Sequence, residues 1–226
     1  MEDSYPTDPE PAVQVHVVRH GEVFNPTGIL YGLLPGYHLS ENGKAMAARL
    51  GECFAPVPLK QLRCSPLERA QETLAPIAAA HPSLEVHTDP RLIEADNKLA
   101  GQRFGKRNTA IFDPRNWHYF VNPMKPSWGE PYTELASRML AAITETAHEL
   151  PPGAQAVLVS HQLPIWIARL AAEGRRLAHD PRKRQCTLGS VTTFRFTEGR
   201  LSGVTYAEPA RDLLREDGNK AFSSGH

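Results

Sequence analysis

The chain has 226 residues, of which 41% are hydrophobic and 22% charged, so it can bury the core of one sizeable domain. Its 25 Lys and Arg residues balance 25 Asp and Glu residues, which argues against nucleic acid or a membrane surface as partner. Three widely spaced cysteines form no CxxC pair and no segment is apolar enough to cross a membrane, so we expect a cytoplasmic protein without a disulfide framework or zinc site.

The first part of the chain alternates between strand and helix patterns. Residues 1–11 are polar and carry three prolines, which predicts a flexible tail, whereas the β-branched residues 13–19 predict a buried strand. Ser40 is suited to cap a helix, because apolar residues follow it at helical spacing. Residues 61–64 predict a short strand, and Ser65-Pro66 then places a cap and a proline at the start of another helix.

The second part of the chain continues this alternation. The predicted elements are strands at 84–87 and 154–160, helices over 134–150 and from Pro164, and a hairpin of 191–196 and 201–206. Strands that alternate with helices predict a three-layer α/β/α sandwich around a mostly parallel sheet, and the hairpin predicts an antiparallel edge strand.

The predicted elements fall within one α/β domain at residues 12–206. The polar residues 207–226 have no clear apolar period and predict a loosely ordered tail. Residues 95–133 are rich in aromatic, basic and proline residues and predict a long insertion. The insertion has two interpretations, a hydrophobic cluster beneath a loop or a lid over a binding site, and its length favours the lid.

Two of the predicted strands run directly into a histidine. One ends in Arg19 and is followed by His20, and the other is followed by His161. In an open α/β sheet, ligands bind beyond the carboxyl ends of the strands, so neighbouring strands would present both histidines to one crevice. A third short strand leads into a helix whose first turn carries Arg69, and a helix start beside an arginine favours an anion.

These residue types suit a phosphate. The guanidinium groups of Arg19 and Arg69 can each form two parallel, charge-assisted hydrogen bonds to phosphate oxygens. Cationic neighbours disfavour a further positive charge and so hold His20 in its neutral, nucleophilic form. The predicted site therefore combines an anion clamp with a nucleophile, and it needs neither a metal nor a cofactor.

Three motifs resemble those of the histidine phosphatase superfamily, in its phosphoglycerate mutase-like branch. Arg19-His20-Gly21-Glu22 is similar to the RHGE signature, and the segment from Ser65 to Thr73 is similar to Ser-Pro-x-x-Arg-Ala-x-x-Thr. Ser160-His161 follows an apolar strand, as the second histidine of that family does. The resemblance spans about residues 13–206, and the order and spacing of the motifs make it specific.

The resemblance implies a role for each residue of the phosphate site. His20 would attack phosphorus and carry a phosphohistidine. Arg19, Arg69 and a protonated His161 would hold the phosphate oxygens as charge develops.

The resemblance also implies roles for three residues around the phosphate site. Asn25 would donate a further hydrogen bond to the substrate, although it lies one residue earlier than in many relatives and could simply form a turn before Pro26. Glu94 would protonate the leaving oxygen and then activate water. Glu22 would be one of the substrate-binding residues, and it is also the second candidate for the general acid in place of Glu94.

Three functions compete for such a site. The first is hydrolysis of a small phosphorylated metabolite, a phosphomonoester, by a metal-independent catalytic domain. The second is a phosphoglycerate-type phosphomutase, but such relatives carry a longer, arginine-rich insertion than residues 95–133, which favours the phosphatase. The third is a non-catalytic phospho-ligand binding protein. The basic run at residues 182–184 indicates a solvated surface or a contact between copies, such as a homodimer, rather than a nucleic-acid site.

Overall fold

The computed structural model describes residues 11–96 and 129–214. Most of the predicted lid at 95–133, with its aromatic residues other than Tyr132, therefore lies outside the described residues, as do nearly all of the first eleven residues. Within the described ranges, no helix is long and apolar enough to cross a membrane.

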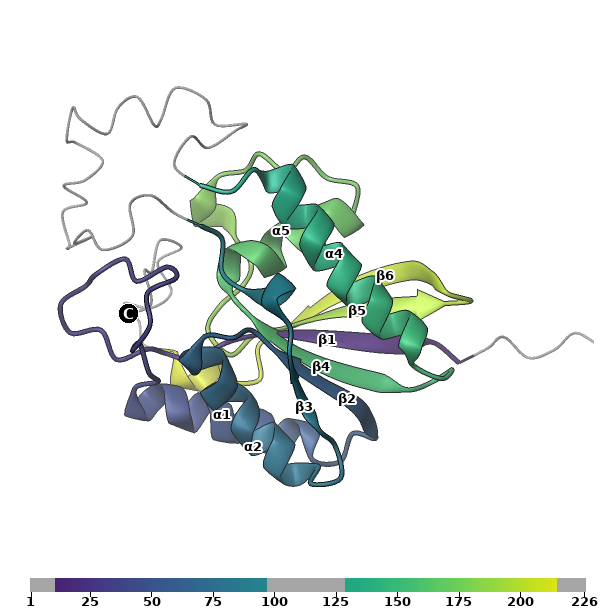
Figure 1. Ribbon diagram of the computed structural model, residues 1–226, viewed down its shortest axis with the longest axis horizontal. Coiled ribbons are helices and arrows are strands. Elements are labelled where there is room, and N and C mark those ends of the chain that lie inside the picture. The colour runs from purple at the N-terminus through teal and green to yellow at the C-terminus, as the bar shows by residue number, and fades with distance from the viewer. Residues whose placement is uncertain (1–10, 97–128, 215–226) are drawn as a thin grey trace, which may run out of the picture.

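A single six-stranded sheet forms the centre of the molecule (Figure 1). Its strands lie in the order β3-β2-β4-β1-β5-β6. The strands are β1 (Val13–Arg19), β2 (Leu59–Cys64), β3 (Val86–Thr88), β4 (Gln155–Ser160), β5 (Val191–Thr197) and β6 (Arg200–Ala207). The predicted strands are thus confirmed, with ends that shift by one or two residues.

The sheet is mostly parallel, as predicted, and reverses at the hairpin. β3, β2, β4 and β1 pair in parallel, whereas β5 pairs antiparallel with both β1 and β6. The reversed strand is therefore β5, which lies next to the edge, and β6 forms the edge itself. The register pairs Arg19 at the end of β1 with Ser160 at the end of β4, so both strands end at the same level.

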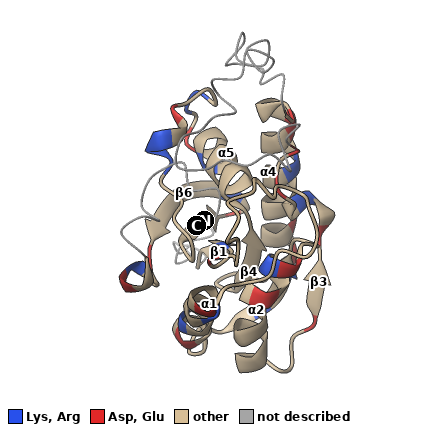
Figure 2. Cartoon of the chain, turned by 90° about the vertical axis from the view of Figure 1, so that its left-hand side faces the viewer, with Lys and Arg blue, Asp and Glu red and all other residues tan. Residues whose placement is uncertain are grey.

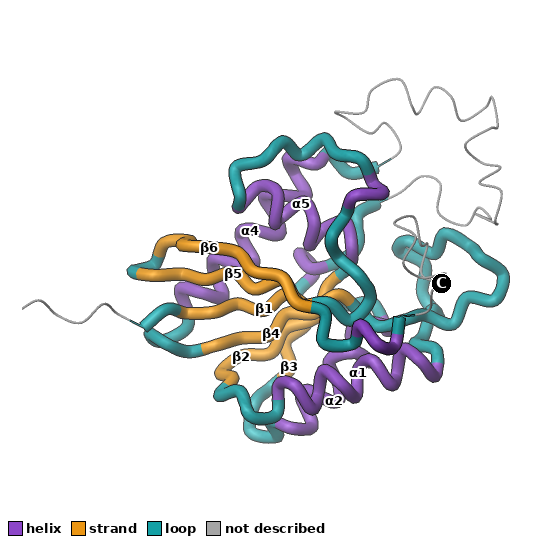
Figure 3. Tube along the Cα trace, turned by 180° about the vertical axis from the view of Figure 1, so that it is seen from behind, coloured by secondary structure: helices purple, strands orange, loops and turns teal. Residues whose placement is uncertain are grey.

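Helices cover both faces of the sheet and make the predicted three-layer sandwich. They are α1 (Glu41–Phe54), α2 (Glu68–Ala80), α4 (Tyr132–Glu149) and α5 (Gln162–Ala172). Figure 3 shows α1 and α2 together on one side of the sheet and α4 and α5 on the other. Short 3₁₀ turns lie at η1 (Pro90–Leu92), η3 (Pro181–Lys183) and η4 (Arg211–Leu213).

The two faces of the sheet have separate apolar cores because side chains alternate along each strand. Val15 and Val17 of β1 pack towards α4 and α5, whereas Val18 packs towards α1 and α2. All three valines are fully buried. Burial on both faces explains the uninterrupted apolar run at residues 156–159 of β4, whereas β1 alternates valine with Gln14 and His16 before Val17 and Val18.

The helix starts show where local sequence signals hold. Ser40 caps α1 as predicted, and its Oγ accepts a hydrogen bond from the Gly43 amide at 3.0 Å. α2 begins at Glu68, two residues after Pro66, with no side-chain cap. The predicted cap, Ser65, instead places its hydroxyl 2.8 Å from Nε2 of His161.

Within the region predicted as a loose tail, the structure describes residues 207–214, and these pack against the domain. Ala210 is only 1% exposed and packs with Met46 and Leu188. Asp212 accepts two hydrogen bonds from the Arg49 guanidinium of α1. A few apolar contacts and one ion pair hold this segment, and such contacts leave no periodic pattern in the sequence.

Candidate active site

The fold brings the two predicted histidines together beyond the carboxyl ends of β1 and β4. These strands are neighbours, and the His20 amide continues their ladder by donating to the Ser160 carbonyl at 3.1 Å. The imidazole rings of His20 and His161 lie with their centroids 5.1 Å apart. Figure 2 looks onto this end of the sheet, between the two helix layers.

Hydrogen bonding fixes which nitrogen of His20 can react. Its Nδ1 lies 2.8 Å from the carbonyl oxygen of Gly21, which can only accept a hydrogen bond. Nδ1 therefore carries the proton and Nε2 holds the free lone pair. Burial, followed by the charges of Arg69 and Arg19, holds the pKa of His20 well below its usual range. The ring is neutral at neutral pH, which is the nucleophilic state.

Gly21 and its surroundings keep the loop after β1 close to the helix layer. A Cβ at Gly21 would lie 2.7 Å from the carbonyl oxygen of Gly43 in α1, so only glycine fits this approach. The Gly21 amide donates to Thr73 Oγ1 at 3.0 Å, which ties the loop to α2. Glycine thus gives the backbone the room that it needs at this position.

Two buried arginines flank the histidines. Arg19 is 4% exposed, and its Nη1 donates to the Cys186 carbonyl at 2.7 Å. Arg69 is fully buried in α2, where Nη2 donates to the Gly32 carbonyl at 2.7 Å and the guanidinium lies 4.7 Å from the ring centroid of Tyr31. Burial lowers the pKa of Arg69, but an arginine keeps its proton in a protein. Each side chain is thus anchored at one nitrogen.

His161 stands as the first residue before α5 and is fully buried. Its Nε2 lies 2.8 Å from Ser65 Oγ, and Ser65 Oγ also accepts the Leu67 amide at 3.4 Å. The hydroxyl proton of Ser65 is therefore available to His161 Nε2, which leaves the imidazole proton on Nδ1. Burial and the charge of Arg69 hold the pKa of His161 well below its usual range. These surroundings favour the neutral ring, whereas the protonated state predicted for the phosphate-bound site stays a prediction.

Unpaired donors concentrate at this site. Among the described residues, six buried side-chain nitrogen or oxygen atoms have no hydrogen-bond partner, and four of them belong to the residues above. These four are Arg19 Nε, Arg69 Nε, Arg69 Nη1 and His161 Nδ1. Buried polar groups are paired in most proteins, so four orphan donors around one imidazole mark an anion site.

Glu94 lies close to the same cations. It follows η1, and its Oε1 accepts the Ala95 amide at 2.9 Å. Withdrawal of the carboxyl from water raises the pKa of Glu94, although the Ala95 amide and the charges of Arg69 and Arg19 act against the rise. A raised pKa favours the protonated acid, which is the form that can protonate a leaving group.

Two predicted substrate-binding residues have other partners in the structure. The Glu22 carboxylate accepts hydrogen bonds from Ser40 Oγ at 2.6 Å and from Asn42 Nδ2 at 3.2 Å, which ties the loop to the start of α1. Asn25 bonds Ile29 through both ends of its amide, at 2.8 and 3.1 Å, and so closes a turn. Asn25 thus acts as the turn former that the sequence also allowed, and Glu22 has an anchoring role.

Sequence reasoning missed two residues of this region. Tyr31 lies in the loop between β1 and α1, is 7% exposed, and stacks on Tyr37 with ring centroids 4.9 Å apart. The charge of Arg184 is among those that act against the rise in the pKa of Glu94. The Arg184 guanidinium donates to His179 and Gln162. Neither position has a periodic signal, and Arg184 sits in a basic run that resembles ordinary solvated surface.

Comparison with known proteins places the chain in a family. The sequence model of the family named Histidine phosphatase superfamily (branch 1) matches residues 15–209, which span nearly the whole described fold. The chain therefore belongs to this superfamily. Within the described residues no group of three or more His, Cys, Asp or Glu side chains is arranged to hold a metal ion.

Individual relatives differ in their assigned activities. An uncharacterized protein of Mycobacterium tuberculosis is 53% identical over 87% of this chain and 96% of its own length. A protein of Yersinia pestis named "Probable phosphoglycerate mutase GpmB" is 30% identical over 79% of this chain and 84% of its own. The structure of a mycobacterial glucosyl-3-phosphoglycerate phosphatase superposes with a TM-score of 0.66 at 22% identity and covers 81% of this chain and 90% of its own.

Proposed function

We propose that the protein is a metal-independent phosphomonoester hydrolase that works through a phosphohistidine on His20. Its substrate would be a small phosphorylated metabolite of the cytoplasm, and neither a cofactor nor a nucleic acid would take part. The observation that carries the proposal is the group of four orphan donors close to His20, whose imidazole tautomer leaves Nε2 free.

In the first half-reaction, the lone pair of His20 Nε2 attacks phosphorus and the bond from phosphorus to the ester oxygen breaks. The protonated Glu94 gives its proton to the departing oxygen, so the alcohol leaves neutral. Arg19, Arg69 and the Nδ1 hydrogen of His161 donate to the three equatorial oxygens, which gather negative charge in the transition state.

In the second half-reaction, the Glu94 carboxylate takes a proton from water as the water oxygen attacks phosphorus. The phosphorus–nitrogen bond breaks, inorganic phosphate leaves, and His20 and the Glu94 acid are restored. The same carboxyl thus serves as acid and then as base, which its environment supports because the raised pKa lies closer to neutrality.

The mutase is the second candidate, favoured by the relative named as a probable phosphoglycerate mutase. A mutase would return the phosphoryl group to a second hydroxyl of the substrate instead of passing it to water. A non-catalytic binding protein is a weaker candidate, because binding alone does not require an acid beside the anion clamp.

Labelled substrates would separate the three functions. The protein is mixed with a panel of ³²P-phosphorylated metabolites and quenched in alkaline denaturant, in which phosphohistidine survives. For the wild-type protein we expect a label that appears on the protein and is then released as free phosphate. For His20→Ala we expect neither label nor turnover, with a fold that circular dichroism shows to be unchanged. Label that appears in a second phosphorylated metabolite would establish the mutase. Binding of a phosphorylated metabolite without label or turnover for any substrate would contradict both enzymatic functions and leave the binding protein.

A further inference from the structure

Segment 89–96, which carries Glu94, has little regular structure of its own. Only η1 (Pro90–Leu92) is helical, and no described strand includes any residue of the segment. Its own backbone hydrogen bonds, from Leu92 to Asp89 and from Ile93 to Pro90, order only the η1 turn, and functional residues in such segments are positioned by the surrounding scaffold. The precision that proton transfer demands must therefore come from neighbouring elements.

Side chains from two other elements hold segment 89–96 by donating hydrogen bonds to its backbone carbonyls. Arg138 of α4 donates Nη1 to the Arg91 carbonyl and Nη2 to the Glu94 carbonyl, the latter at 3.4 Å. Ser160, the residue before His161, donates its hydroxyl to the Leu92 carbonyl at 2.7 Å. Three carbonyls within four residues are thus held from outside the segment.

Glu130 fixes the orientation of the Arg138 guanidinium. The Glu130 carboxylate accepts from Arg138 Nε at 2.7 Å and from Nη2 at 2.8 Å, a planar two-point pair. The Glu130 amide in turn donates to the Asp96 carbonyl at 3.3 Å. A Cβ at Gly129 would lie 2.5 Å from that carbonyl, so the approach requires glycine. Residues 129–130 and Arg138 together close a clamp around the end of the segment.

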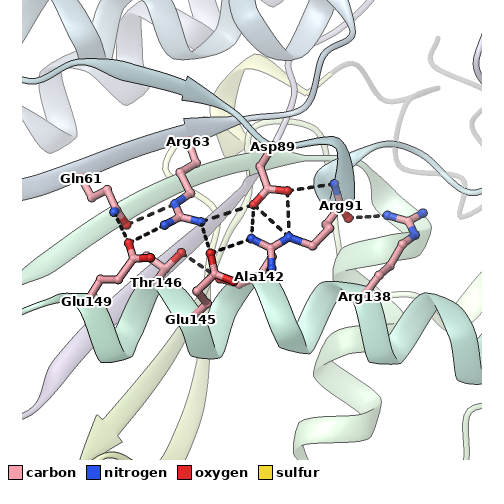
Figure 4. Close-up of polar contacts among 9 residues, drawn as sticks. All are labelled: Gln61, Arg63, Asp89, Arg91, Arg138, Ala142, Glu145, Thr146 and Glu149. Atoms are coloured by element: carbon pink, nitrogen blue, oxygen red, sulfur yellow. Dashed lines mark hydrogen bonds and ion pairs between the residues drawn. The ribbon is translucent and has the colours of Figure 1, made fainter.

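A second set of ion pairs secures the start of the segment (Figure 4). The Arg91 guanidinium pairs with Asp89 at 2.7 Å and with Glu145 of α4 at 2.7 Å. Hydrogen bonds from Arg91, and then from Arg63, lower the pKa of Glu145 to about 2. Figure 4 shows Arg138 and Glu145 on the same face of α4, both directed at this segment.

We propose that Arg138, oriented by Glu130, is a positioning residue that holds the Glu94 carboxyl where it protonates the leaving oxygen. The proposal rests on the proposed function, since it assigns Glu94 the acid role. Arg138 itself needs no contact with the substrate. Its effect on the reaction passes through the carbonyls of Arg91 and Glu94, so its loss should impair the steps that need a proton from Glu94 more than the others.

Leaving groups of different basicity report on that proton. 4-Nitrophenolate departs without a proton, whereas the alkoxide of a simple alkyl phosphate requires one. Single-turnover rates of phosphoenzyme formation are measured for both substrates with wild type, Arg138→Met, Glu130→Gln and Glu94→Gln. Arg49→Met is the matched control, because Arg49 also makes a two-point ion pair, with Asp212, but does not contact segment 89–96.

We expect Glu94→Gln to slow the alkyl phosphate by about 10²-fold or more relative to the aryl phosphate. Arg138→Met should show the same bias, about tenfold or more, and Glu130→Gln a smaller one, while Arg49→Met leaves the ratio unchanged. Adding Arg138→Met to Glu94→Gln should not alter the ratio further. If Arg138→Met does not fold, Glu130→Gln provides the same test.

The outcomes separate this inference from the proposed function. A leaving-group bias in Glu94→Gln that is absent from both Arg138→Met and Glu130→Gln would overturn the positioning role alone. The lack of any bias in Glu94→Gln would instead remove the acid role of Glu94, and this inference with it. An equal loss for both substrates in Arg138→Met would show a purely structural role.

Discussion

At the residue scale, the site depends on partners that occupy one nitrogen of each side chain and leave at least one other nitrogen unpaired. Gly21 occupies Nδ1 of His20, Ser65 occupies Nε2 of His161, and one carbonyl anchors each arginine. The other nitrogens include Nε2 of His20, the proposed nucleophile, and the four orphan donors. Pre-organisation of this kind lowers the cost of ordering the groups in the transition state.

Substitution of Arg69 should reduce the activity strongly without reducing the stability of the fold. Arg69→Met removes two orphan donors, and we expect kcat/KM to fall by about 10²–10³-fold. A buried guanidinium without full pairing destabilises the fold, so the free energy of unfolding should stay level or rise. Steady-state kinetics and urea titration check both parts. Retained activity, or a large loss of stability, would count against the anion clamp.

The sequence predicted the four central residues because their signals are local. His20, Arg19 and His161 stand at the ends of two strong apolar strands, and Arg69 follows a helix-start signal. The turn formed by Asn25 was one of two uses that the sequence allowed, whereas the partners of Glu22 at the start of α1 leave no local signal. Tyr31 gave no signal at all, because a lone aromatic residue in an irregular loop has no period to interpret.

At the element scale, three strand ends and two helix starts converge on the site. β1 and β4 deliver the histidines, while the turn after β2 delivers Ser65 and then Arg69. The Ser65 amide donates to the Val159 carbonyl at 3.0 Å, so the start of α2 is tied directly to β4. The element types could be predicted from periodicity, but their ends could not, since Ser65 serves His161 and not α2.

Ser65 should control the tautomer of His161. In Ser65→Ala the imidazole proton is free to move to Nε2, which would turn a lone pair of Nδ1 towards the phosphate oxygens. We expect kcat to fall about tenfold or more, in line with one lost hydrogen bond to a charged group, with little change in KM. Thr192→Val is the matched control, because the buried Thr192 hydroxyl bonds no described atom. Equal rates in wild type and Ser65→Ala would refute this role.

At the scale of the whole molecule, a neutral net charge conceals a local cluster of buried cations at the site. Arg19 and Arg69 are both buried beside two neutral histidines. The overall charge balance therefore gives no sign of an anion site, because the site depends on where individual charges are placed. The expectation that neither nucleic acid nor a membrane is a partner stays a prediction. The layers of the fold could be predicted from the alternation of strand and helix patterns, whereas the packing of residues 208–214 depends on long-range contacts that leave no pattern in the sequence.

The buried histidines should make the fold sensitive to mild acid. Burial lowers the pKa of His16, His20 and His161, so below pH 6.5 the unfolded chain binds more protons than the folded one. Stability is therefore present above pH 6.5 and is lost as the pH falls, by at most about 1.4 kcal/mol per pH unit for each histidine. His38, whose pKa the Glu72 contact raises, opposes this trend from an exposed position.

Denaturant titration between pH 7.5 and 5.5 measures this trend, and the carboxylates with lowered pKa values contribute little in that range. We expect the free energy of unfolding to decrease steadily below pH 6.5. A constant or rising value over the same range would show that the buried histidines are charged in the folded protein.

The central claim is that Nε2 of His20 bonds to phosphorus, and the position of phosphate on the ring tests it most directly. The protein is mixed with 4-nitrophenyl phosphate, quenched in alkali and analysed by ³¹P NMR and peptide mass spectrometry. The structure predicts phosphate on Nε2 of His20, because the Gly21 carbonyl holds a proton on Nδ1. Phosphate on Nδ1, or on any residue other than His20, would contradict it.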